Sequence, residues 1–163
     1  MRAPAPLLLL ATLIAACGGS DPKALTNEGT AALNSGDAPK AVAAFDRALE
    51  HMDAKQPDYL RAAVGRCQAL ARIEPERAKV DFLALANDPA VKVAEADFTA
   101  VATELVRRGA LPQATSLAEA GLKRFPESAA MKSLRDLVGD AAQKSKDPAA
   151  LERLKGLGYA GDG

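Results

Sequence analysis

Few side chains in this 163-residue chain could catalyse a reaction or bind a metal, because it contains one histidine and two cysteines. Cys67 and His51 would be the nucleophile and the base, and neither lies in a motif that activates a nucleophile. A zinc site needs several converging histidine or cysteine ligands. Neighbouring carboxylates such as Glu95 and Asp97 point to different sides of a predicted helix. We therefore predict that the protein is not an enzyme and uses no metal and no cofactor.

The other cysteine, Cys17, follows a segment with the layout of an export signal. Met1-Arg2 provides a positive start, an apolar run extends from Leu7 to Ala16, and small residues precede the cysteine in Ile14-Ala15-Ala16-Cys17. This ten-residue run is shorter than the roughly 18 to 20 residues that a transmembrane helix needs. Ile-Ala-Ala-Cys resembles the lipobox of bacterial lipoproteins. The resemblance implies that residues 1–16 are removed and that Cys17 carries fatty acyl chains such as palmitate.

Acyl chains on Cys17 would anchor the mature chain to a membrane, since several buried chains hold far more tightly than one. Residues 17–21 are short and polar and would form a flexible tether. In lipoproteins of double-membrane bacteria, an Asp after the cysteine favours the inner membrane. Gly18 stands there, so the resemblance implies the outer membrane, facing the periplasm. The alternative is an ordinary secretory signal in which Cys17 is incidental.

Composition narrows the class of partner. The 21 Lys and Arg residues are balanced by 21 Asp and Glu residues, whereas proteins that neutralise nucleic-acid phosphates normally carry a basic excess. We therefore expect no nucleic acid as partner. Alanine is abundant and aromatic residues make up 4% of the chain, which favours closely packed helices over sheet.

The chain from residue 22 to about residue 144 reads as successive amphipathic helices separated by short breaks. Asp21-Pro22 and Asp147-Pro148 are typical of a helix N-cap followed by proline in the first turn. Breaks are predicted near residues 34–37, 56–57, 74–75, 87–89, 109 and 125–126, and no strand is predicted. We expect one all-α domain over residues 22–144, followed over residues 145–163 by a short helix and a mobile C-terminal tail. The end of this tail, Leu154 to Tyr159, is also apolar enough to pack onto the array.

The predicted helix pairs recur with a regular period. Ala41, Ala78 and Ala114 occupy matching places at spacings of 37 and 36 residues, which is typical of a helical repeat array. The units resemble tetratricopeptide (TPR) repeats at small and large core positions: Leu25, Gly29, Ala32, Gly36, Ala41, Phe45 and Ala48 in the first, Ala78, Phe82 and Leu85 in the second, and Phe98, Ala102, Leu105, Gly109, Ala114, Gly121 and Pro126 in the third. The first unit lacks the closing proline, and the second places Arg66 where a small residue is usual. The alternative is an alanine-rich helical bundle with accidental periodicity.

The resemblance implies a right-handed α-α superhelix of about three TPR-like hairpins, closed by a C-terminal capping helix over residues 127–144. In that family the first helix of each hairpin lines a concave, partner-binding surface. Carried over unit by unit, this groove would be mostly small and apolar, with Leu33, Leu60, Cys67, Leu70, Thr103, Val106 and Arg107 as its partner-binding residues. The positions of the family's carboxylate clamp hold Thr26, Thr30, Val64, Ala96 and Ala100, so binding of chaperone C-termini is not expected.

These features predict a membrane-anchored periplasmic lipoprotein that acts as a protein-binding scaffold or adaptor for a protein or peptide partner in the cell envelope. An apolar groove suits an amphipathic helix or a hydrophobic segment. The groove could instead be filled by the chain's own end, Leu154 to Tyr159. Two alternative functions remain: a self-associating structural subunit, and a non-catalytic subunit that positions an envelope hydrolase. Cys67 is expected to be buried or available for an intermolecular disulfide.

Overall fold

A computed structural model describes residues 21–161, so the predicted leader and Cys17 lie outside the described residues. The described part of the chain forms eight helices and no strand, which confirms the predicted all-α class. The helices are α1 (Pro22–Asn34), α2 (Ala38–Leu49), α3 (Pro57–Ile73), α4 (Pro75–Asn87), α5 (Glu95–Arg107), α6 (Leu111–Arg124), α7 (Ala129–Ser145) and α8 (Pro148–Lys155).

The helix boundaries have local causes in the sequence. Asp21, Asp37 and Asp147 each accept a hydrogen bond from a backbone N–H in the first turn of α1, α2 and α8, and a proline follows each of them. After α1 and α5, Gly36 and Gly109 have φ angles of +88° and +71°. This left-handed backbone, which glycine adopts at little cost, ends a helix and reverses the chain. The predicted caps and breaks are confirmed at these positions.

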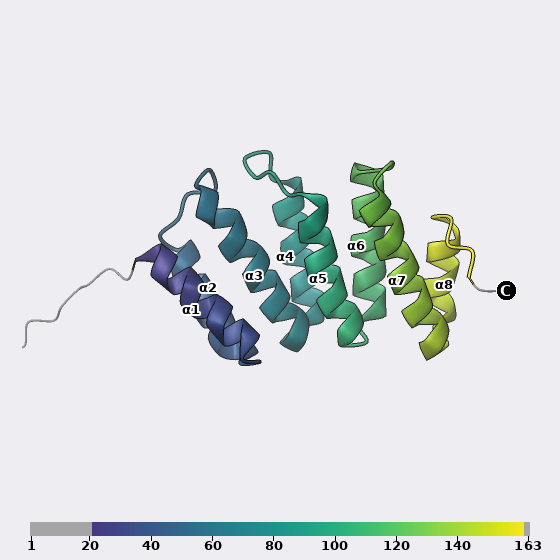
Figure 1. The fold of residues 1–163 in the computed structure, drawn as a ribbon, viewed down its shortest axis with the longest axis horizontal. Coiled ribbons are helices and arrows are strands. Elements are labelled where there is room, and N and C mark those ends of the chain that lie inside the picture. Colours follow the sequence, from purple (N-terminus) through teal and green to yellow (C-terminus); the bar gives the residue numbers. More distant parts are fainter. Residues whose placement is uncertain (1–20, 162–163) are drawn as a thin grey trace, which may run out of the picture.

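The helices pack in two layers, one behind the other in Figure 1, where the odd-numbered helices lie nearer the viewer. The odd-numbered helices form one layer, in which α1 contacts α3, α3 contacts α5 and α5 contacts α7. In the other layer α4 contacts α6 and α6 contacts α8, but no contact joins α2 to α4 within residues 21–161. Each odd-numbered helix also packs against the even-numbered helix that follows it. The second layer is therefore interrupted between α2 and α4.

The core lies between the two layers. Its larger cluster of buried side chains extends from α3 to the C-terminal segment, and a smaller cluster joins α1, α2 and α3. Three phenylalanines join α4, α5 and the end of α6 in the larger cluster, since the Phe82 and Phe98 ring centroids are 4.9 Å apart and those of Phe98 and Phe125 are 6.1 Å apart. Both pairs meet edge to face, a favourable geometry for aromatic rings.

The C-terminal segment differs from what the sequence predicts. The helix expected as a lone cap, α7, pairs with α8, which also packs against α6. The tail was predicted to be mobile or to pack onto the array, and it packs on α7, because Tyr159 is 7% exposed and its hydroxyl donates a hydrogen bond to Asp140 Oδ1 at 3.0 Å. A Cβ atom added at Gly139 would overlap the Tyr159 ring. Glycine at this position therefore makes room for the ring.

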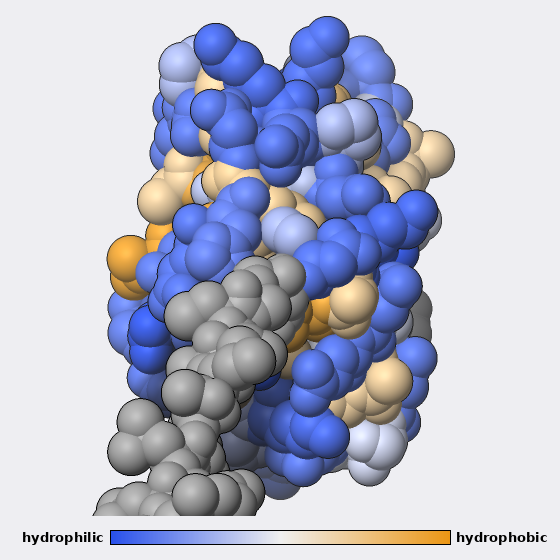
Figure 2. Space-filling view, turned by 90° about the vertical axis from the view of Figure 1, so that its left-hand side faces the viewer, coloured by the Kyte–Doolittle hydropathy of each residue, from blue (hydrophilic) through white to orange (hydrophobic). Residues whose placement is uncertain are grey.

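The opposite end of the molecule is formed by α1 and α2. Figure 2 shows that this end is mostly hydrophilic, with small apolar areas between the charged side chains. Helical arrays need such polar ends, because an exposed apolar stripe would recruit further copies.

Candidate binding groove

A shallow groove crosses the outward face of α5 in the odd-numbered layer. Its volume is about 660 Å³, and it lies between α3 on one side and the start of α7 on the other. The lining residues are Gln68 of α3, Glu95, Ala96, Thr99, Ala100, Thr103, Glu104 and Arg107 of α5, and Ala130 of α7. The groove is therefore built from three hairpins.

Small side chains form the floor of this α5 groove. Ala96, Ala100, Thr103 and Arg107 follow one another at spacings of four, three and four residues, which places them along one face of the helix. The Thr99 hydroxyl donates a hydrogen bond to the Glu95 carbonyl oxygen at 3.1 Å, so it is satisfied within α5. A floor of alanine and threonine allows the backbone of a bound segment to approach closely.

An ion-pair network lies beside the groove floor. The Glu104 side chain is 9% exposed and accepts hydrogen bonds from Arg72 Nη2 at 2.8 Å and from Arg107 Nη1 at 3.0 Å. Arg72 Nη1 also donates to the Leu33 carbonyl oxygen at 2.7 Å. The network therefore joins the ends of α1, α3 and α5. Arg107 leaves 68% of its side chain exposed at one end of the groove.

Only part of the predicted partner-binding set lies in this groove. Thr103 and Arg107 line it together. Leu33, Cys67 and Leu70 are 7%, 3% and 0% exposed. Buried side chains cannot contact a partner at the surface, so we correct their assignment from groove to core.

The other predicted residues lie at the edges of the core. Leu60 lines a separate cavity of about 360 Å³ with residues of the loops before α3 and before α5. Val106 is partly buried and packs against the larger core cluster. Tyr159 and Leu154 are buried with α7 and α8, and neither lines the α5 groove. The chain's own end therefore does not fill it.

Cys67 faces the opposite side of the molecule, toward the gap between α2 and α4. Burial raises the pKa of the Cys67 thiol to about 12, and the nearby Asp81 carboxylate adds to the rise. Thiolate is the nucleophilic form of cysteine, so this environment suppresses its reactivity. The geometry supports the buried alternative for Cys67.

We expect Cys67 to react slowly with thiol reagents in the folded protein. A pKa raised from 9.0 to about 12 lowers the thiolate fraction near pH 8 about a thousandfold. The measurement is the rate of labelling of a Cys17→Ser chain at pH 8, with the urea-unfolded chain as control. The rate of the folded chain should keep rising above pH 9, where that of the unfolded chain levels off. Equal rates for the two states would show that Cys67 is accessible, as an intermolecular disulfide requires.

Within residues 21–161, no group of three or more histidine, cysteine, aspartate or glutamate side chains is placed to hold a metal ion. His51 is exposed, just beyond α2. None of the helices in the same range is both long enough and apolar enough to cross a membrane.

Among the residues that line the groove, Gln68, Glu104 and Ala130 were not predicted from the sequence. Gln68 follows Cys67 directly, and Glu104 follows Thr103. Ala130 comes from a helix that was expected to act only as a cap. A glutamate within an otherwise apolar stretch of α5 was the available signal, because a buried carboxylate requires a cationic partner.

Comparison with known proteins adds no relative, since no protein-family model, no curated protein and no solved structure matches this chain.

Proposed function

We propose that the protein is a membrane-tethered scaffold of TPR-like hairpins that holds a segment of an envelope protein in the α5 groove. The observation that carries this proposal is the groove itself, a continuous hollow to which three hairpins contribute side chains. The repeated pairing of an odd-numbered helix with the next even-numbered one supports the TPR-like part. The lipobox supports a tether at Cys17 in the outer membrane, facing the periplasm.

The chemistry of the groove defines the segment that it would bind. Its alanines and threonines fit small apolar side chains or a closely approaching backbone, as in an extended strand or a helix rich in small residues. At one end, Arg107 and the neighbouring Arg108 are exposed, and within residues 21–161 the Arg107 guanidinium donates one hydrogen bond, to Glu104. An acidic side chain in the partner would pair with these guanidinium groups.

Tethering would compensate for a shallow groove. A lipid anchor confines the scaffold to a thin layer near the membrane, which raises its effective concentration toward membrane-associated partners. Modest affinity would then suffice for stable association. The non-enzymatic role is part of the proposal, since the groove holds no histidine or cysteine among its lining residues.

Site-specific crosslinking in cells tests the groove. A photoreactive amino acid at Ala96, exposed on α5, should capture a defined partner, whereas the same amino acid at Ala149, exposed on α8, should not. Capture from Ala96 should fall at least about tenfold with Ala100→Glu and with Arg107→Ala, because the first fills the floor and the second removes the cation. Ala149→Glu is the matched control, because it adds the same side chain at an exposed alanine that does not line the α5 groove, and it should leave capture unchanged. Equal capture from both positions, or capture that survives both groove variants, would contradict the proposal.

The tether is tested separately. An alkyne-labelled palmitate should enter the wild-type chain and not the Cys17→Ser chain, and the variant should move from the membrane to the soluble fraction. Continued membrane attachment of Cys17→Ser would refute the lipid anchor and leave the groove proposal intact.

A further inference from the structure

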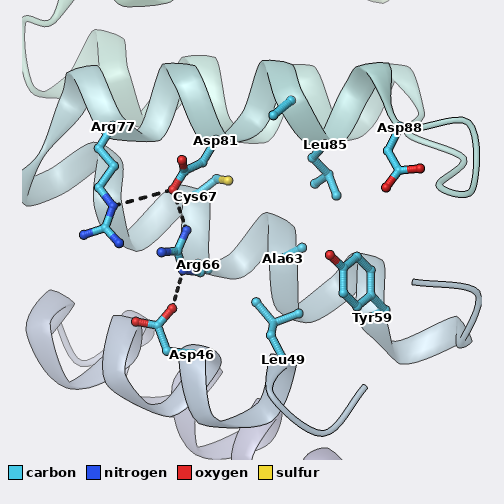
Figure 3. A pocket seen from close by; sticks show the side chains of 11 residues that line it. Asp46, Leu49, Tyr59, Ala63, Arg66, Cys67, Arg77, Asp81, Leu85 and Asp88 are labelled. Carbon is cyan, nitrogen blue, oxygen red and sulfur yellow. Dashed lines mark hydrogen bonds and ion pairs between the residues drawn. The ribbon is translucent and has the colours of Figure 1, made fainter. Parts of the chain in front are cut away.

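The interruption between α2 and α4 forms a slot on the face opposite the α5 groove. Its volume is about 540 Å³, its walls come from α2 and α4, and its floor comes from α3. Figure 3 shows the side chains that line it, with a charged group at one end and an apolar section beside it. The slot exists because α2 and α4 make no contact with one another, unlike the later pairs of even-numbered helices.

The charged end of the slot is internally paired. The Arg66 side chain is 16% exposed and donates hydrogen bonds to Asp46 of α2 and, at 2.6 Å, to Asp81 of α4. Arg77 lies 3.7 Å from Asp81 and 3.6 Å from Glu74. Both guanidinium groups therefore already have carboxylate partners. Desolvation lowers the pKa of Arg66, but its bonds to the two aspartates outweigh this and raise it overall.

The other end of the slot carries a negative charge without a cation. The Asp88 carboxylate accepts one hydrogen bond, from the backbone N–H of Ala90 at 2.8 Å, and it forms no ion pair within the part of the chain that the structure describes. Tyr59 lines the same end (Figure 3), and within residues 21–161 its hydroxyl has no hydrogen-bond partner. The slot as a whole is lined by three aspartates and two arginines.

An apolar section separates the two ends. Leu49, Ala63 and Leu85 lie between the Arg66 group and Asp88 in Figure 3. Asp81 and Leu85, four residues apart, lie on one stripe of α4, and Asp88 is the residue that directly follows this helix. Seven residues of helix span about 10.5 Å. The slot therefore accommodates a short hydrocarbon chain with a polar end.

We propose that the slot binds a primary alkylammonium group, with the ammonium on Asp88 and the hydrocarbon chain against Leu49, Ala63 and Leu85. The unpaired carboxylate supplies the charge, the Tyr59 hydroxyl supplies a further acceptor, and the apolar section holds the chain. An organic anion is disfavoured because its carboxylate would have to compete with Asp46 and Asp81 for Arg66. The ammonium group can come from a free alkylamine or from the side chain of a lysine in a peptide.

The test is an NMR titration of the folded chain with three probes of equal length: n-pentylammonium, pentan-1-ol and pentanoate. We expect n-pentylammonium to shift the backbone amides of Leu49, Tyr59 and Leu85 with a Kd on the order of 1 mM. Pentan-1-ol and pentanoate should bind at least about tenfold more weakly, because neither can form an ion pair with Asp88. Equal binding of pentan-1-ol, or stronger binding of pentanoate, would overturn the proposal.

Two variants show whether the response depends on the slot. Asp88→Asn removes the charge but keeps an oxygen that can accept from Ala90, so it should fold normally and weaken n-pentylammonium about tenfold. Glu127→Gln, which removes an exposed carboxylate outside the slot, is the matched control and should change nothing. Ala84→Lys places an ammonium on the slot wall four residues before Asp88 and should also abolish binding. Unchanged binding in both slot variants would refute the site.

The two sources of the ammonium group are distinguished by a fourth probe, Nα-acetyl-lysine N-methylamide. Binding of this probe at the same amides, with the same loss in Asp88→Asn, would assign the slot to a lysine side chain. Binding of n-pentylammonium without binding of the lysine probe would assign it to a free amine. Absence of binding by both probes would contradict the proposal.

Discussion

Replacing Glu104 by alanine is expected to lower the free energy of unfolding by about 3–5 kcal/mol, the range for breaking a buried ion pair by removing one partner. The Arg72 side chain is 15% exposed and donates two hydrogen bonds to this carboxylate. Without Glu104 its charge stays in a poorly solvated place with the Leu33 carbonyl oxygen as its remaining acceptor. Urea unfolding followed by circular dichroism measures the loss.

Two further variants separate the buried pair from its exposed neighbour. Arg107→Ala removes a hydrogen bond to the same carboxylate, but the Arg107 side chain is 68% exposed, so we expect a loss below about 1 kcal/mol. The double variant Arg72→Met/Glu104→Leu removes both charges and should recover most of the lost stability, except about 1 kcal/mol for the bond to the Leu33 carbonyl oxygen. A loss below about 1 kcal/mol for Glu104→Ala would show that this network contributes little.

The Arg72–Glu104 pair also links stability to the proposed function. It connects α1, α3 and α5 directly beneath the groove. Loss of partner capture in Glu104→Ala would therefore report a rearranged groove as well as a lost contact. Arg107→Ala is the better probe of recognition, because it changes the exposed surface and leaves the buried pair in place.

The sequence predicted the helices well because their ends depend on local chemistry. Asp21 and Asp147 cap helices at the predicted positions, and Gly36 and Gly109 lie in predicted breaks, where they end helices. Such signals involve residues within one turn of each other. They require no knowledge of the tertiary arrangement.

The orientation of α3 was harder to predict. Seventeen residues long, it packs against α1, α2, α4 and α5, and eight of its residues are buried. A helix that is apolar on most sides gives no clear periodicity, and one residue along the sequence turns the side chain by about 100°. This is why Cys67 was assigned to the groove, whereas Gln68 lines it.

The slot and the ion pairs are features that a single sequence does not indicate. Arg66 was recognised as a departure from the small residue usual at its position, and in the structure it reaches both Asp46 and Asp81. A long side chain at that place occupies the space between α2 and α4, where a small residue would allow closer approach. The ion pairs across this gap join Arg66 to Asp46 and Asp81, which lie 20 and 15 positions away in the sequence.

A second large loss of stability is expected when Phe45 is replaced. This side chain is 1% exposed and lies between two glycines of neighbouring helices. A Cβ atom added at Gly29 of α1 or at Gly65 of α3 would come within 2.7 Å or 2.6 Å of the Phe45 ring. Both glycines therefore let the ring fit between α1 and α3. Phe45→Ala empties this space and should lower the free energy of unfolding by about 3–5 kcal/mol.

The effect of Gly65→Ala on the free energy of unfolding should depend on the residue at position 45. In the wild-type chain, alanine gains about 1 kcal/mol of helix propensity but overpacks the ring at a cost of about 1–3 kcal/mol, so the net effect is zero or destabilising. In the Phe45→Ala background the ring is absent, and the same substitution should stabilise the protein by about 1 kcal/mol. A double-mutant cycle in urea measures the difference.

The matched control is Gly139→Ala, which meets the Tyr159 ring at the far end of the molecule. Gly139→Ala should lower the free energy of unfolding by the same amount with phenylalanine or with alanine at position 45. If Gly65→Ala also had the same effect in both chains, Phe45 would not explain why α3 has a glycine at position 65.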